Sequence, residues 1–481
     1  MDYKPFLTRQ LAGRAAFLSL MLVPALQLAA APASKAPAAV PGFTFVKSLG
    51  GIDEYRLDFN GMQVLIKPDH SAPVVTFNVL YRVGSRNEVT GTTGSTHLLE
   101  HLMFKGSEAF NNARGNSVDQ YLERVGGQYN ATTSEDRTNY FATVGRDSLQ
   151  GYMAIESDRM RNLWLHDKDK QTEMTVVRNE YERGENDPTN ALMKEVSAAA
   201  YQALPYHHPT IGWRSDIENV SIEKLRAFYD TFYWPNNATA ILVGDVDDPS
   251  ALALVKKYYG GYPQSPRDIP EIYTQEPEQT GPRRVTVKRP GQLGTVIIAH
   301  KIPNARDADM APIAVLDAIL SEGKNSRLYR ALVDTGMCTN AGAMGGGSRD
   351  LSLHMLFASL APGAKQEDVE KTALAEIERI KKDGVTAQEV TSAIRRYHSG
   401  TAFMRDGTAA IASGLNETVA SGDWTLYVTM EDKVAQVTPA DVQRVARKYL
   451  NEDQGTTGWF VPVVAEQNAA NAAAGQSAAT P

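Results

Sequence analysis

The pattern of hydrophobic and polar positions changes along the chain from the period of a strand to the period of a helix. Residues 62–69 (MQVLIKPD) and 73–84 (PVVTFNVLYRVG) are rich in β-branched and apolar side chains, which predicts two strands. Residues 93–105 and 115–124 then predict helices, and Ser117 is the candidate N-cap of the second. The first part of the chain is therefore expected to form a sheet covered by helices.

The same alternation continues to about residue 262. Residues 128–144 (QYNATTSEDRTNYFATV) are rich in Thr, Tyr, Phe and Val and predict strands, and residues 238–247 (ATAILVGDVD) predict a short buried strand. Further helices are predicted over residues 146–162, 169–183 and 249–261.

A second half follows a segment rich in proline and glutamate, residues 263–283, which is typical of a linker. Residues 294–302 again predict a strand, and a helix is expected from Met310. Residues 94–106 can be laid over residues 311–323 without gaps, with the apolar positions preserved. We infer a duplicated domain and predict an α+β fold of two homologous sheet-plus-helix domains.

The length of 481 residues is sufficient for two domains with separate cores. The predicted divisions are a signal peptide at 1–31, a linker at 32–44, an N-terminal domain at 45–262, a linker at 263–283, a C-terminal domain at 284–465 and a disordered tail at 466–481.

The N-terminus has the pattern of a secretory signal peptide. Lys4, Arg9 and Arg14 precede an apolar run over residues 15–31, which is followed by small residues and prolines. A retained signal anchor is the alternative, because the run approaches the minimum length of a membrane span. No later stretch is long and apolar enough to cross a bilayer, so we expect an exported protein with no membrane span after signal removal.

Composition narrows the class of protein further. The content of 42% hydrophobic and 22% charged residues is ordinary for a globular protein. The net charge of −7 is mild and spread along the chain, so it favours neither a nucleic-acid partner nor an anionic membrane surface. Cys338 is the one cysteine, which excludes an intramolecular disulfide and a thiol-only zinc site.

The candidate chemistry lies in the segment His97-Leu98-Leu99-Glu100-His101. Histidines at positions i and i+4 and a glutamate at i+3 share one face of a helix. Two imidazoles beside a carboxylate are typical of a catalytic zinc pocket, and the order HxxEH is the inverted form of the commoner HExxH. The alternative is a core helix whose histidines are only hydrogen-bonded.

A zinc site of this kind needs a third protein ligand. The predicted helix at 169–183 offers Glu173 and Glu180, which are seven residues apart and lie close to one face, and also Glu182. Spacing alone does not choose among the three. His207 and His208 lack the helical spacing, and we expect them to structure a loop.

Several segments together resemble the inverted zinc peptidases, the family of pitrilysin, insulin-degrading enzyme and the mitochondrial processing peptidase. The resemblance covers most of residues 45–460 in the order of the family. The matching segments are VGSRNEVTGTTGSTHLLEHLMFKGSEAF, VGGQYNATTSEDRTNYFATV, VVRNEYERGENDP, TIGWRSDIENVSIEKLRAFYDTFYWPNNATAILVGDVD and EGKNSRLYRALVDTG.

The resemblance implies a role for each motif residue. It implies His97, His101 and Glu180 as the ligands of one Zn²⁺ per chain, so that 45–262 is the zinc-binding peptidase domain. Glu100 is then the general base that activates the attacking water, and Glu173 is an auxiliary acidic residue outside the metal's ligand set. When residues 94–106 are laid over 311–323, Ala314 and Ala318 stand at the histidine positions, so the second domain is expected to lack metal ligands.

The resemblance also implies how a substrate is held. The strand at Asn130 and Ala131 is expected to pair with the backbone of a peptide substrate by adding it as a further strand. The two domains together are expected to form one half of a clamshell chamber. The implied function is an exported, periplasmic zinc metalloendopeptidase that hydrolyses peptides or unfolded polypeptide segments.

One feature of the family is missing. Many members carry an arginine and a tyrosine, seven residues apart, that hold the substrate; here Thr339 stands near the tyrosine position and Leu332 or Val333 near the arginine position. We therefore expect a heterodimer with a homologous zinc-less subunit, with a homodimer as the second choice. The alternative function is a non-catalytic structural subunit of a processing-peptidase-like complex.

Overall fold

The computed structural model describes residues 40–463. The predicted signal peptide at 1–31, the linker up to residue 39 and the predicted tail at 466–481 lie outside the described residues. Between residues 40 and 463, no helix combines the length and the apolar character needed to cross a membrane.

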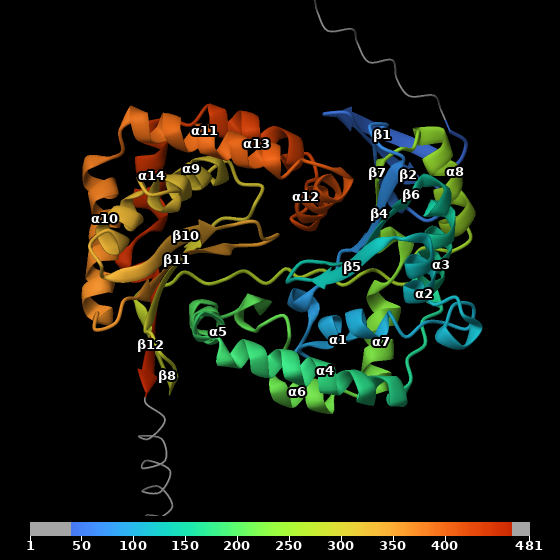
Figure 1. Cartoon of the computed structure of the whole chain (residues 1–481), viewed down its shortest axis with the longest axis horizontal. Coiled ribbons are helices and arrows are strands. Elements are labelled where there is room, and N and C mark those ends of the chain that lie inside the picture. Colours follow the sequence, from blue (N-terminus) through green and yellow to red (C-terminus); the bar gives the residue numbers. More distant parts are fainter. Residues whose placement is uncertain (1–39, 464–481) are drawn as a thin grey trace, which may run out of the picture. The chain divides into compact units, whose positions relative to one another are not determined.

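The first sheet has seven strands and carries the strands predicted in the N-terminal half (Figure 1). Their order across the sheet is β1-β2-β3-β7-β4-β6-β5, with β3 and β7 parallel and β5 at one edge. The strands are β1 (Phe43–Leu49), β2 (Ile52–Leu57), β3 (Gln63–Pro68), β4 (Val74–Tyr81), β5 (Gln128–Thr133), β6 (Thr138–Gly145) and β7 (Ala238–Gly244). β1 starts two residues inside the segment predicted as a linker.

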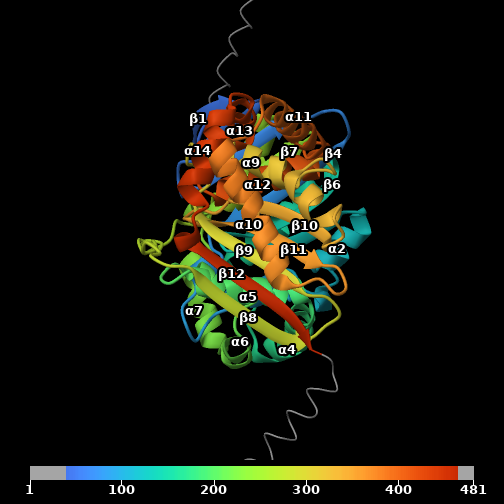
Figure 2. The same cartoon turned by 90° about the vertical axis from the view of Figure 1, so that its left-hand side faces the viewer.

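The second sheet has five strands in the order β10-β11-β9-β12-β8 (Figure 2). They are β8 (Arg283–Pro290), β9 (Thr295–Ile302), β10 (Cys338–Gly345), β11 (Ser352–Leu360) and β12 (Gly455–Val463). β12 is parallel to β8 and antiparallel to β9, as β7 is parallel to β3 and antiparallel to β4. The order β5-β6-β4-β7-β3 thus repeats strand for strand, which confirms the predicted α+β fold of two homologous sheet-plus-helix domains.

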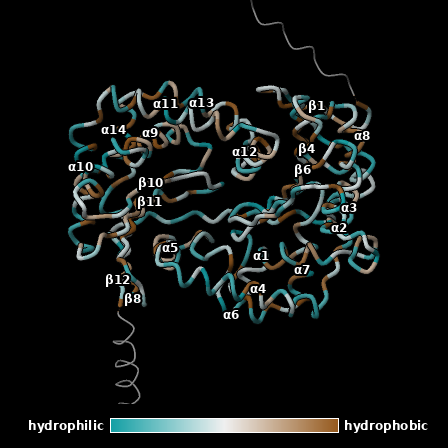
Figure 3. The backbone as a smooth tube through the Cα atoms, in the orientation of Figure 1, coloured by the Kyte–Doolittle hydropathy of each residue, from teal (hydrophilic) through white to brown (hydrophobic). Residues whose placement is uncertain are grey.

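Helices fill the connections between the strands. They are α1 (Ser95–Leu102), α2 (Val118–Val125), α3 (Leu149–Arg161), α4 (Asp167–Asn186), α5 (Pro188–Ala200), α6 (Arg214–Asn219), α7 (Ile222–Phe232), α8 (Asp248–Tyr259), α9 (Met310–Ser321), α10 (Gln366–Asp383), α11 (Ala387–Phe403), α12 (Thr408–Ala420), α13 (Leu426–Ala435) and α14 (Pro439–Tyr449). Ser117 caps α2 as predicted. α4 is largely hydrophilic and α9 largely hydrophobic (Figure 3).

The two halves of the chain exchange one covering helix each. α12, from the second half, packs on the first sheet through Leu415, beside the strand residues Leu65 and Ile241. α5, from the first half, packs on the second sheet, where Val196 and Phe460 belong to one buried cluster. Each sheet is thereby covered on one face by a helix from the other half. These two clusters combine residues of both halves, whereas the main core of each domain is built from its own half.

A buried histidine in the second sheet makes the stability of the protein sensitive to acid. His300 on β9 is 2% exposed, and burial lowers its pKa to about 3, so it is neutral in the folded chain. The unfolded chain takes up a proton below about pH 6.5 that the folded chain refuses, so stability is lost as the pH falls from 6.5 towards 3. We expect a loss of about 3 kcal/mol from this group between pH 7 and pH 4.

Urea denaturation of the parent and of His300→Gln at pH 7 and pH 4 measures this loss. The parent midpoint should fall more steeply with acid than that of the variant. His166→Gln, at a largely exposed histidine, is the control and should follow the parent. An equal fall in the parent and in His300→Gln would show that other groups carry the acid sensitivity.

Candidate metal centre

The HLLEH segment forms most of α1, a helix of eight residues packed into the first domain. Leu98, Leu99 and Leu102 are completely buried in the core of this domain, which fixes one face of the helix. The opposite face carries His97, Glu100 and His101 and lies against α4 and β5. The packing of three leucines therefore decides where the polar side chains point.

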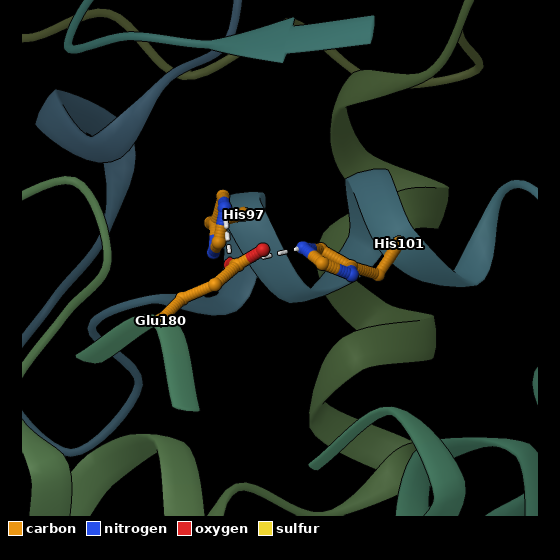
Figure 4. A group of neighbouring side chains, drawn as sticks. All are labelled: His97, His101 and Glu180. Atoms are coloured by element: carbon orange, nitrogen blue, oxygen red, sulfur yellow. Dashed lines mark ion pairs between the residues drawn. The ribbon is translucent and has the colours of Figure 1, made fainter. Parts of the chain in front are cut away.

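His97, His101 and Glu180 converge on one point between α1 and α4 (Figure 4). Their ligand atoms all lie within 4.8 Å of one another. Oε2 of Glu180 is 3.6 Å from Nε2 of His97 and 3.5 Å from Nε2 of His101. In the described part of the chain, no other group of three His, Cys, Asp or Glu side chains is arranged in this way.

This donor set fits zinc. Ligands bound tetrahedrally at 2.0–2.1 Å from a zinc ion lie about 3.4 Å apart, close to the separations found here. Burial lowers the pKa of His97 to about 4, with a further contribution from His101, so His97 is neutral near pH 7, as a metal ligand must be. Two imidazoles and one carboxylate leave a fourth position open, which is typical of catalytic rather than structural zinc.

Glu173 lies behind His101. Its Oε2 is 3.1 Å from Nδ1 of His101, the ring nitrogen that faces away from Glu180, and its other oxygen forms an ion pair with Lys105. A carboxylate in this position fixes the tautomer and the orientation of a metal-binding imidazole. Glu182 instead faces Arg214, with its Oε1 3.8 Å from Nη2 of the arginine. The structure thus distinguishes three glutamates that spacing left equivalent.

We predict that Glu173→Gln weakens zinc binding or lowers kcat/KM by about 10-fold to 100-fold, because His101 loses the carboxylate that orients it. Glu182→Gln is the matched control, on the same helix but outside the cluster, and should leave both quantities unchanged. Competition with a chromogenic chelator and steady-state kinetics measure them. Equal values for the two variants would contradict a role for Glu173.

Glu100 is held beside the cluster by β5. The hydroxyl of Thr133, at the end of β5, donates a hydrogen bond to Oε2 of Glu100. Burial raises the pKa of the Glu100 carboxyl above its ordinary value, and the bond from Thr133 opposes this shift. A carboxyl group with a raised pKa in a partly enclosed position is suited to accept and return a proton.

β5 offers a free edge next to Glu100. It is the last strand of the first sheet and, among residues 40–463, pairs only with β6. Asn130 is exposed on it, whereas Ala131 is buried. The Ala131 N–H donates to Oδ1 of Asn130, 2.9 Å away, instead of to a neighbouring strand. This edge can accept an additional strand.

The structure adds two residues that the sequence reasoning missed, Thr133 and Lys105. Thr133 is two residues after Ala131 on a strand, so both face the same side of the sheet, and this alternation was available from the sequence. Lys105 has no such signal, because its contact with Glu173 depends on how α1 crosses α4. His207 and His208 do not join the cluster; Nδ1 of His207 lies 2.9 Å from the Leu204 carbonyl.

Comparisons with known proteins decide the family. The zinc protease PqqE of Helicobacter pylori is 30% identical over 408 residues, which cover 84% of this chain and 91% of that protein. The chain belongs to the M16 family of peptidases. Two M16 domain models match it: insulinase (peptidase family M16) over residues 63–213, and the peptidase M16 inactive domain over residues 219–397.

Solved M16-like structures share the fold. The crystal structure of a protease from Helicobacter pylori superposes with a TM-score of 0.80 at 29% identity and covers 88% of this chain and 100% of that one. The periplasmic protease PqqL from Escherichia coli superposes with a TM-score of 0.71 at 19% identity and covers 87% of this chain but 48% of PqqL. Relatives named as zinc proteases support a peptidase function for this M16 chain.

Proposed function

We propose that this chain is an exported zinc metalloendopeptidase that holds one Zn²⁺ through His97, His101 and Glu180. The observation that carries the proposal is the convergence of these three side chains from two helices on one point. Glu100 lies on the same helix face as the two histidines, and the edge strand β5 borders it.

Zinc held by these three side chains would act as a Lewis acid and would lower the pKa of the attacking water. The chain supplies the proton transfers. A carboxylate oxygen of Glu100 takes a proton from the attacking water and later delivers it to the nitrogen of the leaving amine. Thr133 holds the Glu100 carboxylate in place, and Glu173 holds the ring of His101.

The substrate is proposed to bind as a strand along β5. A carbonyl oxygen of the bound peptide displaces the Asn130 side chain and accepts the Ala131 N–H in its place. Backbone pairing of this kind does not depend on the substrate's side chains and requires an extended segment. This favours peptides and unfolded polypeptide segments as substrates.

A partner subunit is proposed to complete the chamber. Leu332, near the expected arginine position, is completely buried. Thr339, near the expected tyrosine position, is exposed on β10 and offers only a hydroxyl group. Neither residue can replace the missing arginine and tyrosine. This chain covers 48% of PqqL, and PqqL carries a second half in the same polypeptide. We propose a heterodimer with a zinc-less homologue; a homodimer is the second choice.

The periplasm is the proposed location, on the basis of the signal-peptide pattern at residues 1–31. The alternative to a peptidase is a non-catalytic subunit. It is disfavoured because the three proposed ligands are all present and lie together in the first domain, whereas alanines stand at the histidine positions of the second.

Hydrolysis of an internally quenched peptide tests the proposal. The purified chain, alone and with any homologous subunit that co-purifies with it, is assayed with and without a chelator. We expect cleavage within the peptide, loss of cleavage on chelation and its return with one equivalent of zinc. Zinc-free protein that never cleaves the peptide would favour the non-catalytic subunit.

A further inference from the structure

The helix that carries the zinc ligands begins without a capping side chain of its own. Its N-cap residue is Gly94, with φ +83°, which has no side chain to bond the first N–H groups of the helix. A Cβ at Gly94 would lie 2.4 Å from the Ile211 carbonyl oxygen and 2.4 Å from Cγ2 of Ile217. No larger residue fits there, so the cap must come from elsewhere.

Glu88 supplies it from six residues upstream. One carboxylate oxygen accepts the Gly94 N–H at 2.8 Å, and the other accepts the Thr96 N–H at 2.7 Å. The side chain is buried away from water. Burial raises the pKa of the Glu88 carboxyl to about 8, and the two backbone N–H groups oppose this shift. The dipole at the N-terminus of α1 also favours the charged form, which makes charge-assisted bonds to these N–H groups.

The loop at residues 205–212, with the sequence PYHHPTIG, encloses the contact between Glu88 and the first turn of α1. Nδ1 of His208 lies 3.9 Å from Oε2 of Glu88, and His208 is itself 4% exposed. Gly212 approaches so closely that a Cβ there would lie 2.5 Å from the Gly94 nitrogen. The loop at residues 205–212 provides no ligand to the cluster of His97, His101 and Glu180. It packs over the Glu88 carboxylate and shields it from water.

We infer that Glu88 is a positioning residue for the metal centre: it fixes the first turn of α1 and thereby the place of His97, the residue that follows Thr96. This inference rests on the proposed zinc-peptidase function. Both bonds end within three residues of His97, so their loss lets the first turn shift while the leucine face still anchors the rest of α1. Groups outside a metal's ligand set that hold its ligands contribute about 10-fold to 100-fold to affinity or activity.

The test compares Glu88→Gln with Glu276→Gln. The first variant keeps the size of the side chain but places an NH₂ group against a backbone N–H, so one bond is lost. Glu276 also has a side chain shielded from solvent. It accepts the backbone N–H groups of Gln202, Ala203 and Leu204, forms an ion pair with Lys301, and lies far along the chain from α1. It controls for the loss of any buried carboxylate that binds backbone.

Three readouts separate positioning from stability: the thermal midpoint, the visible spectrum of the Co²⁺-substituted protein, and kcat and KM for the quenched peptide. We expect both variants to melt earlier than the parent. Glu88→Gln alone should change the Co²⁺ spectrum, weaken zinc binding about 10-fold or more and lower kcat about 10-fold or more, with KM within about twofold of the parent.

A Glu88→Gln protein with the parent spectrum and kcat would overturn the inference, as would equal spectral changes in both variants. If Glu88→Gln does not fold, Glu88→Asp replaces it; its shorter carboxylate cannot reach both N–H groups, and a parent-like spectrum and zinc affinity would again overturn the inference. The spectrum reports on ligand geometry without turnover, so it also separates this inference from a failure of the proposed peptidase activity.

Discussion

Glu100→Gln should lower turnover by orders of magnitude while leaving the metal in place. The amide cannot accept a proton from the attacking water, yet it has the size of the carboxylate and can still accept the bond from Thr133. Loss of a positioned general base costs about 10²-fold to 10⁴-fold in rate, so we expect kcat to fall by that factor. Zinc content and the thermal midpoint should remain those of the parent.

The control for this variant is Glu123→Gln, on α2 of the same domain and exposed to solvent. It should retain full activity. Kinetics with the quenched peptide and metal analysis of the same preparations decide the matter. A Glu100→Gln protein with near-parental kcat would assign the proton transfer to another residue.

Glu180→Gln should remove the metal itself. The cluster has one carboxylate oxygen facing two imidazole nitrogens at 3.5 Å and 3.6 Å, and an amide replaces this anionic donor with a neutral and weaker one. We expect zinc content to fall from about one equivalent to less than about a tenth. Hydrolysis should fall to the level of the chelated parent.

The folded state provides a second measurement for the same variant. A metal that binds only the folded chain raises its thermal midpoint, so added zinc should stabilise the parent and leave Glu180→Gln unchanged. Glu182→Gln, two residues further along α4, should respond to zinc as the parent does. A Glu180→Gln protein that keeps one equivalent of zinc would place the third ligand elsewhere.

The sequence predicted the parts of the site that depend on spacing within one helix. His97, Glu100 and His101 lie on one face of α1 because positions i, i+3 and i+4 do so in any α-helix. The choice between Glu173 and Glu180 could not be made this way, because seven residues return to the same face. It depends on how α4 crosses α1: Glu180 reaches the Nε2 atoms, and Glu173 reaches Nδ1 of His101.

The fold shows the same division. The ungapped match of residues 94–106 with 311–323 predicted a duplication, and the repeated strand order confirms it. The exchange of α5 and α12 between the sheets was not predictable, because an amphipathic helix shows that one face is buried but not which sheet covers it. The capping of α1 by Glu88 was hidden for a related reason, since Glu88 lies outside the helix that it holds.

The most direct test of the central claim is the location of zinc in the purified chain. An anomalous difference map measured at the zinc absorption edge should contain one peak per chain, 2.0–2.2 Å from His97 Nε2, His101 Nε2 and a carboxylate oxygen of Glu180. No peak at these three residues in zinc-replete crystals, or a peak held by a different set of side chains, would contradict the account.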